Sequence, residues 1–268
     1  MSPKCLIRAA LLCFSLLAAA AGAQTSQPPP QQAAPDSGPV RNVVLVHGAF
    51  LDGSSWNGVI DRLQKKGYHV SAVQIPLTSL ADDAAATRRV LARQNGPTIL
   101  VGHSWGGTVI TEVGADAPNV VGLVYVAAIP PDVGETTADQ LKHGPESPAN
   151  AGIQRDGNDF LWFNPAAWHN DLAADVPQEL TRVLAAGQQP IAAKALSEPV
   201  TRAAWESKPS WYVVTTRDRA VPPETQEWVA QRIGATVVRL PSSHLAPVSH
   251  PSEVAAVIEQ AAREESKQ

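Results

Sequence analysis

Cysteine is almost absent from this chain of 268 residues, and its two cysteines, Cys5 and Cys13, both lie near the N-terminus. The rest of the chain therefore has no disulfide, no thiol nucleophile and no cysteine ligand for a metal. Metal-binding patterns such as H-E-x-x-H and the dinucleotide-binding pattern G-x-G-x-x-G are also missing. The sequence thus predicts neither a metal nor another cofactor.

Charged residues are scarce as well, at 17% of the chain, and their net charge is only −4. Lysine and arginine are scattered, whereas a surface that binds nucleic acid needs clustered positive charge. Hydrophobic residues make up 44%, which is too many for a disordered chain and enough for a sizeable core. These values exclude a nucleic-acid partner and predict a globular protein of one large domain or two small ones.

Apolar runs are too short for a comfortable membrane span, but the N-terminus has the order of an export signal. Lys4 and Arg8 precede a largely apolar stretch, and a small-x-small sequence follows at residues 21–23 (AGA). This order is typical of a secretory signal peptide rather than of a buried helix. We therefore predict a signal peptide over residues 1–23, and expect the mature protein in the periplasm or outside the cell.

Proline and glutamine dominate the segment that follows. Residues 24–39 (QTSQPPPQQAAPDSGP) offer almost no apolar surface to bury, and they predict a disordered linker. The folded domain is expected to span residues 40–268.

Short, largely apolar runs alternate with helical patterns in this domain. The runs predict strands at residues 42–46, 68–73, 98–101, 120–126, 211–216 and 236–240. The patterns between them predict helices at residues 54–66, 81–94, 105–115, 224–232 and 251–263. Apolar strands separated by helices indicate an α/β fold, with a mostly parallel sheet and helices on both faces. Active sites of such sheets lie at the carboxyl ends of the strands.

Residues 131–208 interrupt the alternation. This segment is rich in Pro, Ala and Asp, contains no convincing strand, and has helical apolar spacing at residues 177–186 and 191–196. We predict a helical insertion that forms a lid over the sheet. Its aromatic residues either pack the lid or line an apolar pocket, as apolar ligand sites commonly are lined.

The strongest motif is residues 102–107 (GHSWGG), directly between a predicted strand and a predicted helix. It is the G-x-S-x-G pattern in the strand–turn–helix context that an exposed nucleophilic serine requires. Such a turn strains the serine, and glycines beside it leave the necessary room. The following helix points free N–H groups toward negative charge that develops near the hydroxyl. Ser104 is therefore the candidate nucleophile.

A serine hydroxyl needs a base and an orienting acid, which follow it in the order acid, then histidine. His244 follows the last predicted strand in a Ser-Ser-His loop, whereas His250 stands at a helix start. Asp218 follows the strand at residues 211–216, and Asp132, after the preceding strand, is the alternative acid. We favour His244 as the base and Asp218 as the acid.

An H-G-x loop that ends in Ala49 follows the first predicted strand. The backbone N–H groups of Ala49 and Trp105 are predicted to form an oxyanion hole. The side chains of Phe50 and Trp105 flank this position and are expected to touch the substrate. Trp162 of the insertion and Leu245, beside the candidate base, are the other candidate substrate contacts.

These motifs resemble the α/β-hydrolase superfamily, and more narrowly bacterial relatives of plant methylesterases and hydroxynitrile lyases. The resemblance rests on residues 44–49 (VLVHGA), 102–107 (GHSWGG), 216–222 (TRDRAVP) and 243–245 (SHL). It covers most of the chain outside the insertion, which matches only loosely. It implies the α/β-hydrolase fold and a Ser-His-Asp triad that works through an acyl-enzyme intermediate.

Two positions favour the esterase side of that branch over the lyase side. The lyases carry Thr where this chain has Gly48, and Lys where it has Leu245. The resemblance implies a carboxylesterase for small to medium uncharged esters. Lactonases, cofactor-free perhydrolases and C–C bond hydrolases share the same triad, and a small-molecule receptor on a hydrolase fold is the alternative of another class.

Overall fold

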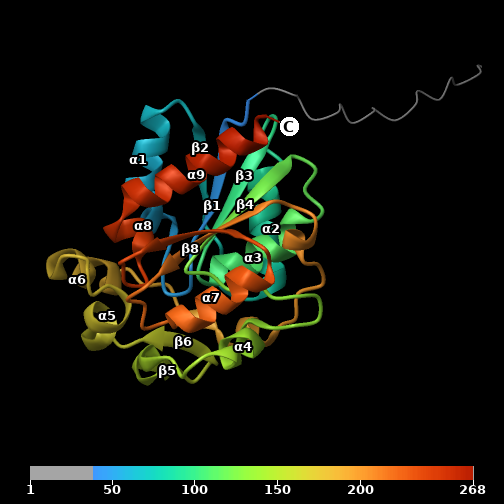
Figure 1. The fold of residues 1–268 in the computed structure, drawn as a ribbon. Coiled ribbons are helices and arrows are strands. Elements are labelled where there is room, and N and C mark those ends of the chain that lie inside the picture. The colour runs from blue at the N-terminus through green and yellow to red at the C-terminus, as the bar shows by residue number, and fades with distance from the viewer. Residues whose placement is uncertain (1–38, 268) are drawn as a thin grey trace, which may run out of the picture. The chain divides into compact units, whose positions relative to one another are not determined.

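A six-stranded parallel sheet forms the centre of the protein, of which the computed structural model describes residues 39–267 (Figure 1). The predicted signal peptide and nearly all of the predicted linker lie outside the described residues. The strand order is β2-β1-β3-β4-β8-β9, and neighbouring strands pair in parallel. The strands are β1 (Asn42–Val46), β2 (His69–Val73), β3 (Thr98–His103), β4 (Val120–Val126), β8 (Ser210–Thr215) and β9 (Thr236–Leu240).

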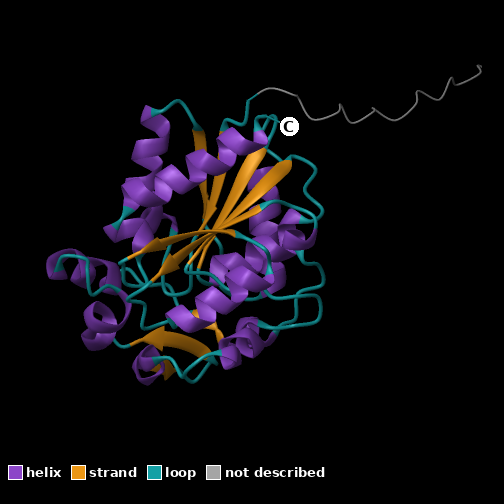
Figure 2. Ribbon diagram, in the orientation of Figure 1, coloured by secondary structure: helices purple, strands orange, loops and turns teal. Residues whose placement is uncertain are grey.

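Helices cover both faces of this sheet, as Figure 2 shows. One face packs against α1 (Asn57–Lys65) and α9 (Pro251–Glu265). The other face packs against α2 (Leu80–Leu91), α3 (Trp105–Gly114) and α7 (Pro223–Arg232). The predicted α/β fold with helices on both faces is therefore confirmed.

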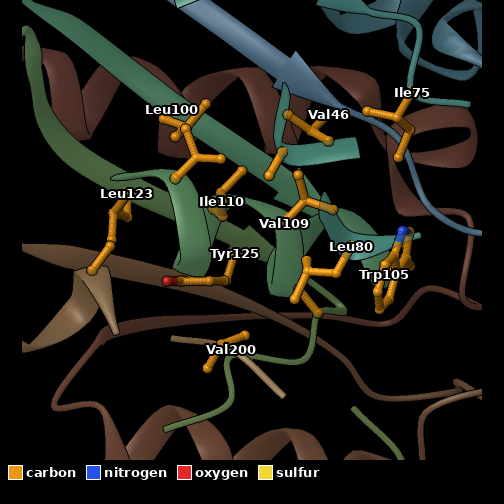
Figure 3. Close-up of a cluster of buried hydrophobic side chains, with 14 of the residues drawn as sticks. Val46, Ile75, Leu80, Leu100, Trp105, Val109, Ile110, Leu123, Tyr125 and Val200 are labelled. Carbon is orange, nitrogen blue, oxygen red and sulfur yellow. The ribbon is translucent and has the colours of Figure 1, made fainter. Parts of the chain in front are cut away.

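Side chains alternate between the two faces along each strand, which explains why the inner strands β1, β3, β4 and β8 are largely apolar, whereas the edge strands β2 and β9 carry exposed residues. Val44 of β1 belongs to the core under α2, α3 and α7, whereas its neighbour Val43 belongs to the core under α1 and α9. Figure 3 shows Val109 and Ile110 of α3 beside Leu100 of β3 in the first of these cores. This two-sided core fixes the sheet, and the sheet fixes the loops at its carboxyl edge.

The insertion, residues 131–208, lies between β4 and β8 and contains a small antiparallel sheet in addition to helices. Its helices are α4 (Thr137–Gln140), α5 (Pro165–Leu172) and α6 (Gln178–Ala186). Its strands, in the order β5-β6-β7, are β5 (Ile153–Arg155), β6 (Phe160–Phe163) and β7 (Ile191–Ala192). The prediction of an insertion without strands was wrong, and the predicted helical stretch at residues 191–196 is a short strand, β7, followed by a 3₁₀ helix (Ala193–Ser197).

A turn made by polar side chains creates the first hairpin of this small sheet. The carboxylate of Asp156 accepts hydrogen bonds from the N–H groups of Asn158 and Phe160, at 2.8 and 3.0 Å. Hydrogen bonds of this kind, from a side chain to nearby backbone N–H groups, stabilise the reversal of the chain between β5 and β6. Asp159 completes the turn in the left-handed region, with φ of 63°.

The insertion lies across the carboxyl ends of the main strands (Figure 1). The indole Nε1 of Trp205 donates to the carbonyl of Pro131 at 3.0 Å and so ties its two ends together. Its own core, which includes Phe163 and Trp168, extends to Leu51 after β1 and to Leu245 after β9. The insertion is thus packed against the loops that carry the candidate site.

Shorter elements complete the described part of the chain. Helix α8 (Ala246–Ser249) precedes α9. Short 3₁₀ helices span Gly53–Trp56, Leu141–His143, Pro148–Gly152, Ala193–Ser197 and Ala204–Glu206. Within residues 39–267, no helix is both long and apolar enough to cross a membrane.

Candidate active site

The turn between β3 and α3 holds Ser104 in a strained conformation, with φ of 51° and ψ of −122°. Its neighbouring glycines have no space for a side chain. A Cβ at Gly102 would lie 2.5 Å from the carbonyl oxygen of Gly106, and a Cβ at Gly106 would lie 2.5 Å from that of Val46. Because a non-glycine residue at positive φ is costly, the tight packing of this turn is what keeps the serine in place.

A chain of two hydrogen bonds links Ser104 to His244 and His244 to Asp218. The Nε2 of His244 lies 2.9 Å from the Oγ of Ser104, and its Nδ1 lies 2.7 Å from the Oδ2 of Asp218. A histidine that donates from Nδ1 to the carboxylate has Nε2 free to accept the serine proton. The loops after β3, β8 and β9 supply the three residues, so the parallel sheet brings together positions far apart in the sequence.

Four further donors fix the orientation of the Asp218 carboxylate. Its Oδ1 accepts from the backbone N–H groups of Ala220 and Val221, at 2.8 and 2.9 Å. Its Oδ2 accepts from the Thr215 hydroxyl at 2.8 Å and from the Gln226 amide at 2.9 Å. The carboxylate is buried, and this full set of partners offsets the cost of its burial.

The alternative acid, Asp132, lies elsewhere. Its carboxylate pairs with the guanidinium of Arg232 at 3.2 Å, and Arg232 also binds Glu135 at 2.8 Å. The structure therefore brings Asp218, and not Asp132, to the histidine.

The two residues that carry the candidate oxyanion donors line the same cavity as the serine. Trp105 is the first residue of α3, where a backbone N–H has no acceptor inside the helix. Ala49 lines the cavity together with Trp105 and Ser104. Gly48 precedes Ala49, and a Cβ at Gly48 would lie 2.9 Å from the Cβ of Ser104. A threonine at this position would thus press on the serine.

His47 holds the loop that carries Ala49. Its Nδ1 donates to the carbonyl of Gly48 at 2.9 Å, and its Nε2 accepts from the N–H of Ile75 at 3.2 Å. Burial lowers the pKa of His47 from its ordinary value, so the ring stays neutral and keeps both bonds. The loop after β1 is thereby fixed to the loop that follows β2.

Asp83 of α2 holds the side chain of Trp105. Its Oδ2 accepts from the indole Nε1 at 2.7 Å, and its Oδ1 accepts from the N–H of Leu77 at 2.7 Å. Burial raises the pKa of Asp83 to about 6, although these two hydrogen bonds act to lower it. The buried carboxylate of Asp83 thus orients the indole of Trp105, one of the pocket residues.

The cavity beside Ser104 has a volume of about 110 Å³ and is lined mainly by apolar side chains. Ser104 and His244 open into it, and among its described lining residues there is no Asp, Glu, Lys or Arg. Of the candidate substrate contacts, Phe50, Trp105 and Leu245 lie in its wall.

Trp162, the remaining candidate substrate contact, does not lie in this wall. It is 37% exposed, and its indole Nε1 donates to Asp156 at 3.0 Å. Side chains alternate along β6, and the neighbours Leu161 and Phe163 line the cavity instead. The Phe163 ring lies 5.7 Å from that of Phe50.

His103 is a site residue for which the sequence reasoning proposed no role. Its ring is buried 4.8 Å from that of His244, and its Nε2 lies 2.9 Å from the His244 carbonyl oxygen, to which it donates. Burial lowers the pKa of His103 well below its ordinary value, so this ring stays neutral. Its place inside the 102–107 motif was the available signal.

No group of three or more His, Cys, Asp or Glu residues within residues 39–267 is arranged to hold a metal ion. The Ser104–His244–Asp218 chain can transfer a proton without one, since each partner is a protein side chain.

The chain belongs to the alpha/beta hydrolase family, whose profile matches residues 43–257. It is 28% identical over 247 residues to an alpha/beta hydrolase of Aspergillus novofumigatus, which covers 83% of this chain and 96% of that protein. A pyrethroid hydrolase from Sphingobium faniae has a similar structure, with a TM-score of 0.72 and 24% identity; the match covers 83% of this chain and 97% of that one. A methylesterase from Arabidopsis has a TM-score of 0.69 and 20% identity, and the match covers 83% of this chain and 98% of that one. The resemblance inferred from the motifs is therefore confirmed.

Proposed function

We propose that the protein is a serine carboxylesterase in which Ser104, His244 and Asp218 act as a catalytic triad. The observation that carries this proposal is the continuous chain of hydrogen bonds, at 2.9 and 2.7 Å, from the serine hydroxyl to a buried carboxylate. A ligand-binding receptor has no need of an activated nucleophile, so a complete proton path favours the enzyme.

The reaction takes place in two halves. Ser104 Oγ attacks the ester carbonyl while His244 Nε2 takes its proton, and the N–H groups of Ala49 and Trp105 bind the oxyanion. His244 then gives that proton to the leaving alcohol, and the acyl group stays on Ser104. A water molecule, deprotonated by the same histidine, then attacks the acyl carbonyl. The acyl–Oγ bond breaks, His244 returns the proton to Ser104 Oγ, and the acid is released. Asp218 keeps the imidazole oriented and stabilises its positive charge.

The wall of the cavity favours small to medium uncharged esters. Apolar side chains surround the serine, and no side chain with a permanent charge lines the space. Each buried methylene of a substrate contributes about 0.8 kcal/mol of binding until the space is filled. The similar proteins include a pyrethroid hydrolase and a methylesterase, which agrees with a small-molecule substrate.

Hydrolysis is favoured over cyanohydrin cleavage at the same serine. A lyase must stabilise departing cyanide with a nearby cation, whereas Leu245 beside the base is apolar and buried. The absence of Asp, Glu, Lys and Arg from the described wall leaves no lysine or arginine in its place.

Turnover of p-nitrophenyl esters by the purified protein tests this function. We expect acetate and butyrate esters to be hydrolysed, and the Ser104→Ala variant to lose about 10⁴-fold or more in turnover. A correctly folded protein that binds such esters without releasing p-nitrophenol would be a receptor, and would refute the proposal.

A further inference from the structure

The insertion holds both residues that flank His244. The carboxylate of Asp175, between α5 and α6, accepts from the N–H of Ser243 at 3.1 Å and also from its hydroxyl. The N–H of Leu245 donates to the carbonyl oxygen of Leu172 at 3.2 Å. The main chain on either side of the proposed base is therefore bonded to one short stretch of the insertion.

Asp175 has the surroundings of a fixed acceptor. Its side chain is 21% exposed, and its Oδ2 also lies 3.4 Å from Nδ1 of His250. Burial acts to raise the pKa of Asp175, but the hydrogen bonds from Ser243 and from two further serines outweigh it and lower that pKa from the ordinary value. The group thus stays ionised, and charged acceptors make the stronger hydrogen bonds.

We propose that Asp175 is a positioning residue, which holds Ser243 so that the His244 ring stays in reach of both Ser104 and Asp218. This inference rests on the proposed function, since it assigns a role to a residue that touches none of the reacting atoms. The insertion then has two roles. Leu161 and Phe163 line the pocket, and Asp175 fixes the loop that carries His244.

The geometry of the histidine makes it sensitive to such support. The ring is held at both ends, by bonds of 2.9 and 2.7 Å to the serine and the carboxylate. A displacement of the loop by about 1 Å lengthens at least one of them beyond a useful hydrogen bond, and misplacement on this scale costs about 100-fold in rate. Asp175 is not among the described residues that line the cavity, so substrate binding is expected to change less than turnover.

Two substitutions of Asp175 separate positioning from charge. In Asp175→Ala both bonds to Ser243 are lost. In Asp175→Asn the amide oxygen can still accept from the Ser243 N–H, and the amide nitrogen can donate to the hydroxyl oxygen. A role through hydrogen bonds therefore predicts that asparagine rescues what alanine loses.

Asp156→Ala is the matched control. This insertion carboxylate also accepts three hydrogen bonds, from the N–H groups of Asn158 and Phe160 and from the Trp162 indole. None of these donors lies in a loop that carries Ser104, His244 or Asp218. Any general damage to the insertion would show in this variant as well.

The experiment measures kcat and KM on p-nitrophenyl butyrate, the rate of fluorophosphonate labelling, and the midpoint of thermal unfolding. We expect Asp175→Ala to lower kcat and the labelling rate by about 10- to 100-fold with KM nearly unchanged. Asp175→Asn should recover most of this loss, and Asp156→Ala should match the wild type in kcat.

Several results would overturn the positioning role while the wild type remains an active esterase. They are an unchanged kcat in Asp175→Ala, a change confined to KM, or an asparagine variant as impaired as alanine. If Asp175→Ala does not fold, Asp175→Leu serves instead, since it keeps a similar side-chain volume and also removes both bonds to Ser243, and an unchanged kcat there would equally refute the role. A wild type with neither turnover nor labelling would instead refute the proposed function.

Discussion

Asp218→Asn is the substitution whose outcome the structure defines most sharply. The Oδ1 position of Asp218 accepts from two backbone N–H groups, those of Ala220 and Val221, which cannot reorient. The asparagine carbonyl oxygen must occupy this position, because an amide nitrogen there would face two donors. The amide nitrogen is then forced to the Oδ2 position, opposite His244.

That orientation gives the histidine the wrong tautomer. An NH₂ group opposite Nδ1 donates to it, so the ring proton moves to Nε2, and Nε2 can no longer accept from Ser104. Loss of the correct tautomer costs about 10⁴-fold in kcat, equivalent to about 5.5 kcal/mol in the activation barrier. The Gln226 amide loses its acceptor at the Oδ2 position but keeps a hydrogen bond to the Val221 carbonyl at 2.7 Å. Folding should therefore change little.

The assay is kcat on p-nitrophenyl butyrate for the wild type, Asp218→Asn and Asp132→Asn, with thermal unfolding as the check on folding. Asp132→Asn is the control, since Asp132 pairs with Arg232 and does not contact His244. If Asp218→Asn keeps more than about a tenth of kcat, far from the loss expected for a wrong tautomer, the reasoning is refuted. The assignment of Asp218 as the acid is also refuted if Asp132→Asn, and not Asp218→Asn, causes the large loss of kcat.

Two other predictions concern the pocket wall and a buried carboxylate. Phe163→Ala should move the optimum of p-nitrophenyl ester chain length upward, because Phe163 lines the cavity, whereas Trp162→Ala should leave it unchanged; equal effects would contradict the assigned wall. Asp83 binds its proton more tightly when folded, since its pKa rises from 3.8 to about 6. Its contribution to stability should therefore fall by about 2 kcal/mol as pH rises from 4 to 7. Urea unfolding of the wild type and Asp83→Asn measures this, and a pH-independent difference between the two would refute it.

The main sheet could be predicted because each of its strands carries an unambiguous local signal. Strands β1, β4 and β9 lie at the predicted residues, 42–46, 120–126 and 236–240. Burial on both faces makes the inner strands, such as β1 and β4, largely apolar, and glycine, proline and polar residues mark strand ends. The same regularity puts the 102–107 motif between a strand and a helix, where the structure has it.

The insertion could not be predicted equally well, because its strands are short and its packing is tertiary. All three residues of β5 are exposed, and β7 has two residues. The sequence Asp-Gly-Asn-Asp at residues 156–159 was the available hairpin signal. β6 reads Phe-Leu-Trp-Phe, so hydrophobicity alone gives no sign that Trp162 faces away from the cavity.

Supporting residues around the site were beyond sequence reasoning for a different reason. Asp83 meets Trp105, and Asp175 meets Ser243, only because the fold joins elements that are 22 and 68 positions apart. Aspartate in a loop or in the first turn of a helix is usually a cap, and nothing local distinguishes these two from caps.

Whether Ser104 is a nucleophile activated by His244 is tested most directly by treating the protein with a fluorophosphonate, followed by intact mass measurement and peptide mapping. We predict one covalent adduct per chain, on Ser104, no adduct in Ser104→Ala, and labelling slowed by several orders of magnitude in His244→Ala. An adduct on another residue that abolishes turnover, or ester turnover retained by Ser104→Ala, would contradict the account.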